Sequence, residues 1–254
     1  MPSFHCFLHL YLYYKYITNN FLKSCLARKK KVIMEGWIVV DYKKLIIESG
    51  KKMYNEGFTI ETWGNISARD PETDLIYLTP SGMDYLICTP DDVVVCNIKG
   101  EIVEGIRKPT IEKELHLSIY RNRPEVNAVV HTHPIYSTVF SCMGEDIPLL
   151  IDEAAQTLGN TVKTSKYALP GTVELADECI KALGKEANAC LLQSHGAVCV
   201  GENMEGAFKV AKVLEVTAEI YQLIRATGGK PIPLSHDNIE AMKEFVKFRY
   251  GQDK

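Results

Sequence analysis

Two histidines separated by one residue, His131 and His133, are well placed for metal chemistry. They lie in the run Val129-Val130-His131-Thr132-His133-Pro134, where the β-branched valines predict a buried strand and the proline ends it. Side chains two apart on a strand project from the same face. Both imidazoles can therefore approach one metal ion.

A third imidazole, that of His195, stands in a comparable setting. It lies between two apolar runs, 189–192 and 197–200, in the segment Gln193-Ser194-His195-Gly196. Three imidazoles leave a metal position open for a substrate, as expected of a catalytic zinc site. Hydrogen-bonding histidines at a strand end are the alternative interpretation. His195 and the acidic segment around Glu112 favour the metal site.

Two glycine-containing segments are candidates for binding an anion. Gly64 permits a sharp bend beside Asn65, which offers a donor and an acceptor, so this segment predicts either a tight turn or an anion-binding loop. Ser81 and Gly82 follow a strand and combine a hydroxyl with an unobstructed backbone N–H, which suits phosphate oxygens, although Pro-Ser-Gly is also ordinary turn chemistry. Two such loops on neighbouring strands strengthen the prediction of a phosphate site.

The segment from Arg107 to His116 opens a helix that ends near Arg123. Thr110 is a candidate N-cap, and the first N–H groups of the helix would add to an anion site. Glu112, in the first turn, can reach whatever lies above the helix start. Its alternative role is to complement the helix dipole.

The elements that must position these residues follow strand and helix patterns. Apolar and alternating runs predict strands at 66–68, 75–78, 93–98, 101–103, 129–133, 147–150 and 162–167. Apolar stripes and caps predict helices at 41–56, 110–123, 135–143, 173–183, 204–226 and 238–250. Strands flanked by helices predict an α/β fold with three layers, α/β/α.

Residues 1–34 differ from the rest of the 254-residue chain, which has no internal repeat. The aromatic-rich run 4–16 precedes the basic cluster 28–31, the reverse of a secretory signal, and Lys15 makes the run too short for a membrane span. We expect 1–34 to be a poorly structured extension, arising from a mis-assigned upstream start, and 35–254 to be one catalytic domain. A weak interfacial anchor is the alternative for the extension.

Composition narrows the class of protein. The formal net charge is −3 and charges of both signs are interspersed, so no basic stripe for nucleic acid is expected. Eight cysteines are scattered without Cys-x-x-Cys spacing, and Cys96, Cys190 and Cys199 lie in apolar runs. This usage predicts reduced core cysteines in a cytoplasmic protein. We expect no membrane partner for the chain.

Five segments, taken together, resemble the class II aldolase/adducin family over about residues 38–251. They are Gly64-Asn65-Ile66-Ser67, Thr79-Pro80-Ser81-Gly82, Lys108-Pro109-Thr110-Ile111-Glu112, His131-Thr132-His133-Pro134 and Ser194-His195-Gly196, in the family's order. The resemblance implies a central mixed, largely antiparallel sheet between helical layers. It also implies an enzyme that acts on a small sugar phosphate.

The resemblance assigns roles to single residues. It implies zinc ligands, or ligands of another divalent ion such as Mn²⁺ or Co²⁺, at His131, His133 and His195. Glu112 falls where the family has an acidic residue that ligates the resting metal or acts as acid/base. The implied phosphate-binding positions are Asn65, Ser81, Gly82 and Thr110. Ile111 stands where the sugar-phosphate enzymes often have serine, which leaves only its backbone N–H for the phosphate.

Near the end of the chain, Arg249-Tyr250-Gly251-Gln252 resembles the family's C-terminal segment. In the family this segment supplies a tyrosine acid to a neighbouring subunit's site. The resemblance therefore implies Tyr250 as a catalytic residue and a homotetramer whose sites lie near subunit interfaces.

Among the family's activities we expect reversible aldol cleavage of a ketose 1-phosphate, such as L-fuculose 1-phosphate, to dihydroxyacetone phosphate and an aldehyde. A zinc ion would stabilise the enediolate as a Lewis acid, so no Schiff-base lysine is required. Glu112 would move the proton at carbon, and we expect a raised pKa to help it do so near neutral pH.

Other activities of the family are alternatives to aldol cleavage. Thr62-Trp63-Gly64-Asn65 and Pro80-Ser81-Gly82-Met83-Asp84-Tyr85 look most like the pentulose-phosphate 4-epimerases, which pass through the same retro-aldol intermediate. Those enzymes, however, have aspartate where this chain has Glu112, and their second-subunit aspartate aligns here with Gln156. A decarboxylase or dehydratase of a related sugar phosphate is a further alternative. So is an adducin-like interaction module without chemistry, although such a module has no need of the three histidines.

Overall fold

The computed structural model describes residues 40–249, and in this part of the chain seven strands form one sheet in the order β4-β3-β2-β1-β5-β7-β6. All pairings between these strands are antiparallel. A parallel contribution is confined to the isolated bridge between Thr164 and Leu191. The strands are β1 (Asn65–Arg69), β2 (Ile76–Leu78), β3 (Val94–Cys96), β4 (Ile102–Glu104), β5 (Ala128–Thr132), β6 (Ala189–Leu192) and β7 (Gly196–Gly201).

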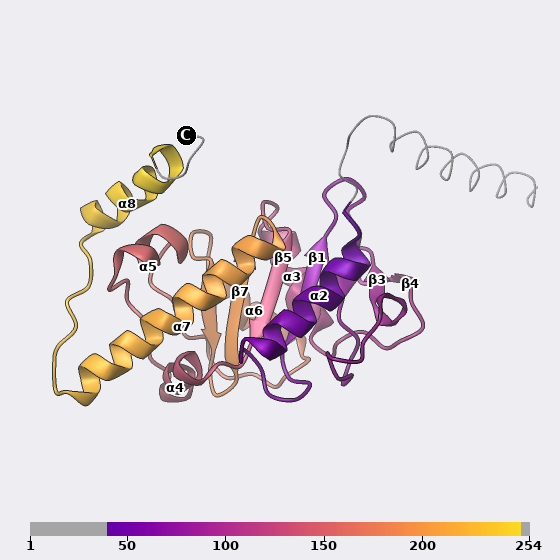
Figure 1. The fold of residues 1–254 in the computed structure, drawn as a ribbon, viewed down its shortest axis with the longest axis horizontal. Coiled ribbons are helices and arrows are strands. Elements are labelled where there is room, and N and C mark those ends of the chain that lie inside the picture. Colours follow the sequence, from indigo (N-terminus) through magenta and orange to yellow (C-terminus); the bar gives the residue numbers. More distant parts are fainter. Residues whose placement is uncertain (1–39, 250–254) are drawn as a thin grey trace, which may run out of the picture. The chain divides into compact units, whose positions relative to one another are not determined.

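Helices cover both faces of the sheet. Figure 1 shows α2 and α7 crossing in front of the strands, with α3 and α6 behind them. The helices are α2 (Tyr42–Asn55), α3 (Lys113–Asn122), α4 (Ile135–Met143), α5 (Asp152–Thr157), α6 (Val173–Leu183), α7 (Met204–Ala226) and α8 (His236–Phe248), with one 3₁₀ turn, η1 (Pro90–Asp92). This arrangement confirms the expected α/β fold.

Alternation along the strands divides the core between the two faces. Ile66 and Ala68 of β1 pack with α2 and α7 in one buried cluster, whereas Val129 of β5 packs with α3 and α6 in the other. The alternate residues, Asn65 and Ser67 on β1 and His131 on β5, therefore lie on the face that α3 covers. This is the face that carries the polar residues of the site.

Helix α6 illustrates how the sequence specifies the layer behind the sheet. Leu175, Cys179 and Leu183 recur every fourth residue and are all buried against the sheet. Burying one such leucine contributes roughly 1.5–3 kcal/mol. At the start of the helix, the Thr172 hydroxyl accepts a hydrogen bond from Leu175 N at 3.2 Å.

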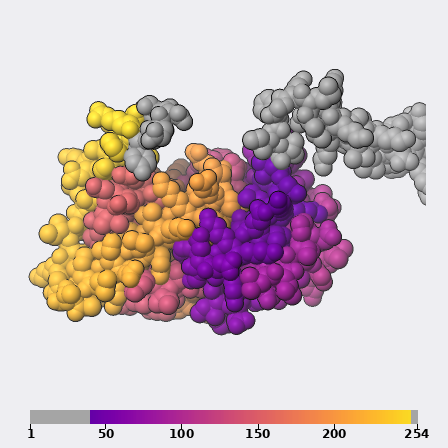
Figure 2. Space-filling model, in the orientation of Figure 1, coloured from indigo at the N-terminus to yellow at the C-terminus, as the bar shows by residue number. Residues whose placement is uncertain are grey.

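On the opposite face, α2 and α7 contact each other over the sheet. Their surfaces, indigo and orange, meet in Figure 2. The ammonium of Lys212 lies 3.1 Å from the carboxylate of Glu56, just beyond the end of α2, and Lys52 lies 4.4 Å from the ring centre of Phe208. Within residues 40–249, no helix combines the length and the hydrophobicity needed to cross a lipid bilayer.

The predicted helices at 135–143, 173–183 and 204–226 are confirmed with the same bounds. The two strands predicted at 147–150 and 162–167 are wrong, because the structure joins these segments by one isolated bridge between Ile147 and Val162. Both of those side chains are fully buried, so the apolar pattern reflects burial without an extended ladder. The short helix α5 was not predicted, since six residues are too few to show a helical period.

Candidate active site

The strand register brings the predicted site residues to one edge of the sheet. Asn65 at the start of β1 pairs with His131 near the end of β5, and Thr132 pairs with Ala197 at the start of β7. The loop after β2 reaches the same edge, because Ser67 pairs with Leu78. Antiparallel pairing thus places segments that are far apart in the chain beside one another.

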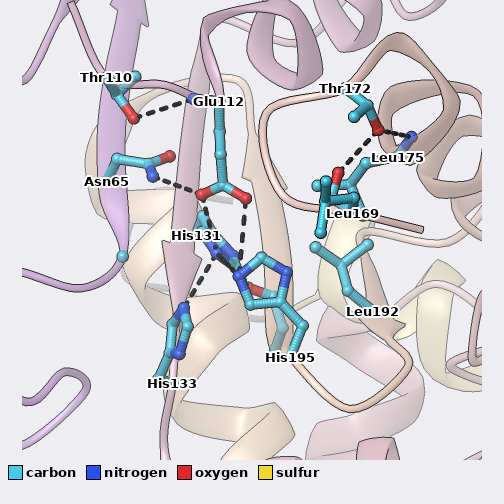
Figure 3. A network of polar contacts seen from close by, with 12 residues as sticks. Asn65, Thr110, Glu112, His131, His133, Leu169, Thr172, Leu175, Leu192 and His195 are labelled. Atoms are coloured by element: carbon cyan, nitrogen blue, oxygen red, sulfur yellow. Dashed lines mark hydrogen bonds and ion pairs between the residues drawn. The ribbon is translucent and has the colours of Figure 1, made fainter. Parts of the chain in front are cut away.

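The three histidines converge as predicted. His131 Nε2 lies 3.1 Å from His133 Nε2 and 3.3 Å from His195 Nε2. All the candidate ligand atoms of this group lie within 4.8 Å of one another. Figure 3 shows the three rings turned toward a common point, with the Glu112 carboxylate beside it. Of the three, His131 is fully buried, while His133 and His195 are half-buried.

The hydrogen bonding of His131 shows that this cluster fits a cation. Its Nδ1 lies 2.9 Å from the carbonyl oxygen of Ala197, which can only accept, so Nδ1 carries the proton of the neutral ring. Its Nε2 is then an acceptor that faces two further imidazole nitrogens and a carboxylate. A cation placed among these four groups would satisfy all of them at once. Nitrogen–nitrogen separations of about 3.3 Å are also those of imidazoles bound tetrahedrally to zinc at 2.0–2.1 Å.

Glu112 completes this cluster. Its Oε2 lies 3.2 Å from His131 Nε2 and its Oε1 lies 3.6 Å from His195 Nε2. Oε2 also accepts a hydrogen bond of 2.7 Å from the amide of Asn65. Oε1 is buried and has no hydrogen-bond partner among the described residues. An unsatisfied carboxylate oxygen directed at imidazoles is a second observation that fits a bound metal ion.

The expected raised pKa of Glu112 is wrong for this arrangement. Burial would raise the pKa of the carboxyl, but the neighbouring His131, together with His195 and the Asn65 amide, holds it well below its usual range. In the metal-free site a proton on His131 therefore keeps Glu112 ionised, and a bound cation would take the place of that proton. As a carboxylate it can face a cation held by the histidines.

The two half-buried histidines, His133 and His195, are neutral near pH 7. Burial, with the neighbouring His131 and His195, lowers the pKa of His133 to about 3, and burial with His131 lowers the pKa of His195 to about 4. Burial would also lower the pKa of His131, but Glu112 outweighs this effect and raises it. Neutral imidazoles are the form that binds metal ions.

His195 is held by the end of α4. The Ser141 hydroxyl accepts a hydrogen bond of 3.2 Å from His195 N and donates one of 2.6 Å to the carbonyl oxygen of Leu192. Ser194 adopts a left-handed backbone conformation with φ of 55°. This tight turn between β6 and β7 presents the imidazole at the sheet edge.

The predicted phosphate-binding residues line one cleft of about 530 Å³ together with Glu112, His133 and His195. The loop after β2 lies beside the loop before α3, since Ser81 N donates to Lys108 O at 3.0 Å and Thr110 N donates to Thr79 O at 3.1 Å. The cleft residues include Asn65, Ser81, Gly82, Thr110, Ile111, Glu112, His133 and His195, with the apolar Trp63 and Pro170 also lining it.

Thr110 is not the N-cap that the sequence predicts. The helix begins two residues later, with Glu112 in the capping position and no side-chain cap. The Thr110 hydroxyl accepts a hydrogen bond of 3.3 Å from Glu112 N, which stabilises a turn before the helix. This turn places Glu112 at the helix boundary, where its carboxylate reaches the histidines (Figure 3). Ile111 is 65% exposed at the cleft.

Tyr250 and the extension at 1–34 lie outside the described residues.

Sequence reasoning gave no role to His116 or Ser67, which the structure connects to Asn65 through buried hydrogen bonds. The spacing of four between Glu112 and His116 on a helix was the available signal.

Comparison with known proteins gives a family for this site. Residues 44–222 match the family model described as the class II aldolase and adducin N-terminal domain. The chain belongs to the class II aldolase and adducin family. The matched range contains all three histidines and Glu112, whereas Tyr250 lies beyond it.

Individual relatives in the class II aldolase and adducin family are similar over most of their length. The chain is 37% identical over 208 residues to a 5-deoxy-D-ribulose 1-phosphate aldolase of Bacillus thuringiensis serovar kurstaki, covering 82% of this chain and 95% of the relative. It is 36% identical over 208 residues to a 5-methylthioribulose-1-phosphate/5-deoxyribulose-1-phosphate aldolase of Rhodospirillum rubrum, covering 82% and 91%. A solved structure of an L-fuculose 1-phosphate aldolase matches with a TM-score of 0.79 and 36% identity, covering 83% of this chain and 98% of that one.

Proposed function

We propose that this chain is a zinc-dependent aldolase that reversibly cleaves a ketose 1-phosphate to dihydroxyacetone phosphate and an aldehyde. The observation that carries the proposal is the convergence of three imidazoles and the Glu112 carboxylate beside a cleft that the two candidate anion-binding loops also line. Family membership and relatives named as aldolases of ketose 1-phosphates support the same reaction.

His131, His133 and His195 would hold the metal ion, with Glu112 beside it. A divalent ion bound there supplies Lewis acidity, which stabilises negative charge on substrate oxygens. Mn²⁺ or Co²⁺ would serve as alternatives to Zn²⁺, because a set of imidazoles and one carboxylate accepts several divalent ions.

The phosphate would be held by the side chains of Asn65, Ser81 and Thr110 and by backbone N–H groups at Gly82 and Ile111. Holding the phosphate fixes the carbon chain of the sugar over the histidines, which converts a loose encounter into an oriented one. The far end of the sugar would contact Trp63 and Pro170. Their apolar surface suits a deoxy carbon better than a hydroxymethyl group.

Glu112 would transfer the proton at carbon. In cleavage, the hydroxyl on the carbon that becomes the aldehyde loses its proton and the adjacent carbon–carbon bond breaks. The electron pair of that bond stays on the phosphorylated fragment as an enediolate, to which the acid form of Glu112 returns a proton. In the condensation direction, Glu112 as carboxylate removes the same proton. We propose Tyr250 as the acid/base at the aldehyde oxygen, contributed by a neighbouring subunit of a homotetramer.

The test is a cleavage assay with the zinc-loaded protein. L-fuculose 1-phosphate, 5-deoxy-D-ribulose 1-phosphate and L-ribulose 5-phosphate are supplied separately, and dihydroxyacetone phosphate is detected by its reduction with NADH and glycerol-phosphate dehydrogenase. Release from either ketose 1-phosphate supports the proposal. Silence on both ketose 1-phosphates contradicts it.

Epimerisation is the second candidate, because Trp63, Gly64 and Asn65 of the epimerase-like segment line the cleft. Conversion of L-ribulose 5-phosphate to a xylulose phosphate would identify it, and loss of carbon dioxide or water from a related sugar phosphate would identify a decarboxylase or dehydratase. Metal analysis distinguishes an adducin-like interaction module, since such a module would purify without near-stoichiometric divalent metal.

Three further parts of the proposal concern the chain as a whole. We propose that 35–254 forms the catalytic domain, so a variant lacking residues 1–34 is expected to keep its turnover. Light scattering of the purified protein is expected to give the mass of a tetramer. Expression as a fluorescent fusion is expected to place the protein in the cytoplasm.

A further inference from the structure

A buried chain of hydrogen bonds leads away from Glu112 on the face of β1 that α3 covers. Asn65 Nδ2 donates to Glu112 Oε2 at 2.7 Å, and Asn65 Oδ1 is hydrogen-bonded to His116 Nε2. His116 Nδ1 lies 2.6 Å from the hydroxyl of Ser67, which lies 2.7 Å from the hydroxyl of Tyr120. Five polar side chains from β1, α3 and the turn before it are thus connected in one line.

This line of hydrogen-bonded side chains is closed to solvent. His116 and Ser67 are both fully buried, with 0% of each exposed, and Tyr120 is 2% exposed. Buried polar atoms without partners are costly, so each group is restricted to the hydrogen bonds that its neighbours in this line offer. The positions of these groups are therefore tightly coupled.

The direction of the hydrogen bonds follows from the ionised Glu112. A carboxylate only accepts, so the NH₂ group of Asn65 faces Glu112 and its carbonyl oxygen faces His116. His116 Nε2 must then donate, and in a neutral ring Nδ1 accepts the Ser67 hydroxyl proton. Burial and the neighbouring His131 lower the pKa of His116 to about 3, which agrees with a neutral ring.

We propose that His116 is a positioning residue that fixes the orientation of Asn65 and, through it, that of the Glu112 carboxylate. The amide nitrogen of Asn65 carries two protons, one of which is given to Glu112. The second is available to a substrate oxygen in the cleft, which Asn65 lines. An Asn65 side chain turned by half a rotation would present its carbonyl oxygen to both Glu112 and the substrate, and both contacts would be repulsive. The Nε2–H of His116 excludes that orientation.

Two variants of similar size separate positioning from simple structural support. The amide of glutamine reaches the position of imidazole Nε2, so His116→Gln keeps a donor for Asn65 and loses the contact with Ser67. The shorter His116→Asn keeps the contact with Ser67 and loses that with Asn65. Each variant gives up one buried hydrogen bond, so both are expected to have similar melting temperatures and similar zinc content.

The kinetic arm of the test rests on the proposed aldolase activity. We expect kcat of His116→Asn to fall about 10- to 100-fold, in the range found for residues that orient metal-site groups indirectly, and His116→Gln to keep most of it. His236 is exposed at the start of α8, so His236→Ala serves as the control whose kcat is expected to stay unchanged. Equal kcat losses in the two His116 variants, or no loss in either, would overturn the proposal.

A second arm needs no substrate. In the wild-type protein labelled with ¹⁵N-histidine, the signals of His116 are identified by their loss in His116→Gln. We expect a protonated Nε2 and an unprotonated Nδ1. Protonation at Nδ1 instead would overturn the proposal, whatever the kinetics show. If the wild-type protein cleaves no sugar phosphate, the aldolase proposal fails and this spectrum still decides the role of His116.

Discussion

The Glu112 carboxylate lies 3.2 Å from His131 Nε2, the nitrogen that also faces the other two imidazoles of the site. One side chain therefore contacts both the candidate metal ligands and the cleft. The site therefore has two proposed functions, metal binding by the histidines and proton transfer by Glu112, and each can be tested by itself.

Replacing Glu112 with glutamine removes proton transfer while leaving the three imidazoles in place. We expect Glu112→Gln to lower kcat about 10²- to 10⁴-fold, the usual contribution of a positioned acid/base, with zinc content close to that of the wild type. Glu114→Gln on the same helix is the matched control, since its carboxylate contacts Arg121 at 2.6 Å away from the histidines. Equal turnover in the two variants would remove Glu112 from the mechanism.

Removing one imidazole is expected to weaken metal binding and lower turnover together. His133→Ala leaves two imidazoles and one carboxylate, and we expect metal affinity to fall about 100-fold or more, since even indirect supports of metal sites contribute 10- to 100-fold. Plasma mass spectrometry of the dialysed protein measures the bound zinc, with His236→Ala as the control. A His133→Ala protein that keeps stoichiometric zinc would show that the metal site lies elsewhere.

Local periodicity was enough to predict much of the site. The spacing of two between His131 and His133 predicted that both imidazoles project the same way, and the structure brings them together although His133 lies one residue beyond β5. Gly144 marked the end of α4. His195 is 62 residues from His133, and its approach depends on the pairing of β5 with β7. Local patterns do not encode such pairing. The association of His195 with the other two histidines was strengthened by the resemblance of several segments to the class II aldolase/adducin family.

The buried line of hydrogen bonds that leads from Glu112 to Tyr120 could not be predicted in the same way. Asn65 and His116 are 51 positions apart and meet only because α3 packs on β1. Polar residues at core positions carry no periodic signal that distinguishes a paired group from a solvated one. The pKa of Glu112 was mispredicted for a related reason, because burial alone raises it and the contact with His131 reverses the effect.

The phosphate-binding assignments predict changes in KM more than in kcat. Ser81→Ala removes a hydroxyl from the cleft, and losing a hydrogen bond to a charged group is expected to raise KM about tenfold or more. Ile111→Ser adds a hydroxyl at a position that is 65% exposed, so we expect KM to fall without loss of stability. Initial rates over a range of ketose 1-phosphate concentrations measure both. An unchanged KM in Ser81→Ala would contradict the phosphate site at this loop.

Tyr250 is proposed as an acid/base at the aldehyde oxygen, and Tyr250→Phe removes only its hydroxyl. We expect kcat to fall about 10²-fold or more, as for other positioned acids, while zinc content stays the same. Mixing Tyr250→Phe with Glu112→Gln protein tests whether the residues come from different subunits. Partial recovery of activity on subunit exchange is expected, and no recovery would place both residues in one chain.

The buried His116 predicts how stability depends on pH in the metal-free protein. Its pKa falls from an ordinary 6.5 to about 3 because burial and the neighbouring His131 disfavour the charged ring. Below pH 6.5 the unfolded chain binds a proton that the folded chain does not, so this residue makes the folded state less stable as pH falls from 6.5 toward 3. At pH 5.5 this loss amounts to about 1.4 kcal/mol relative to pH 7.5. In urea unfolding with EDTA, His116→Gln is expected to lose less stability than the wild type between these two pH values, by about that amount. Equal losses would mean that His116 is protonated in the folded protein, and its Nδ1 could not then accept the Ser67 hydroxyl proton.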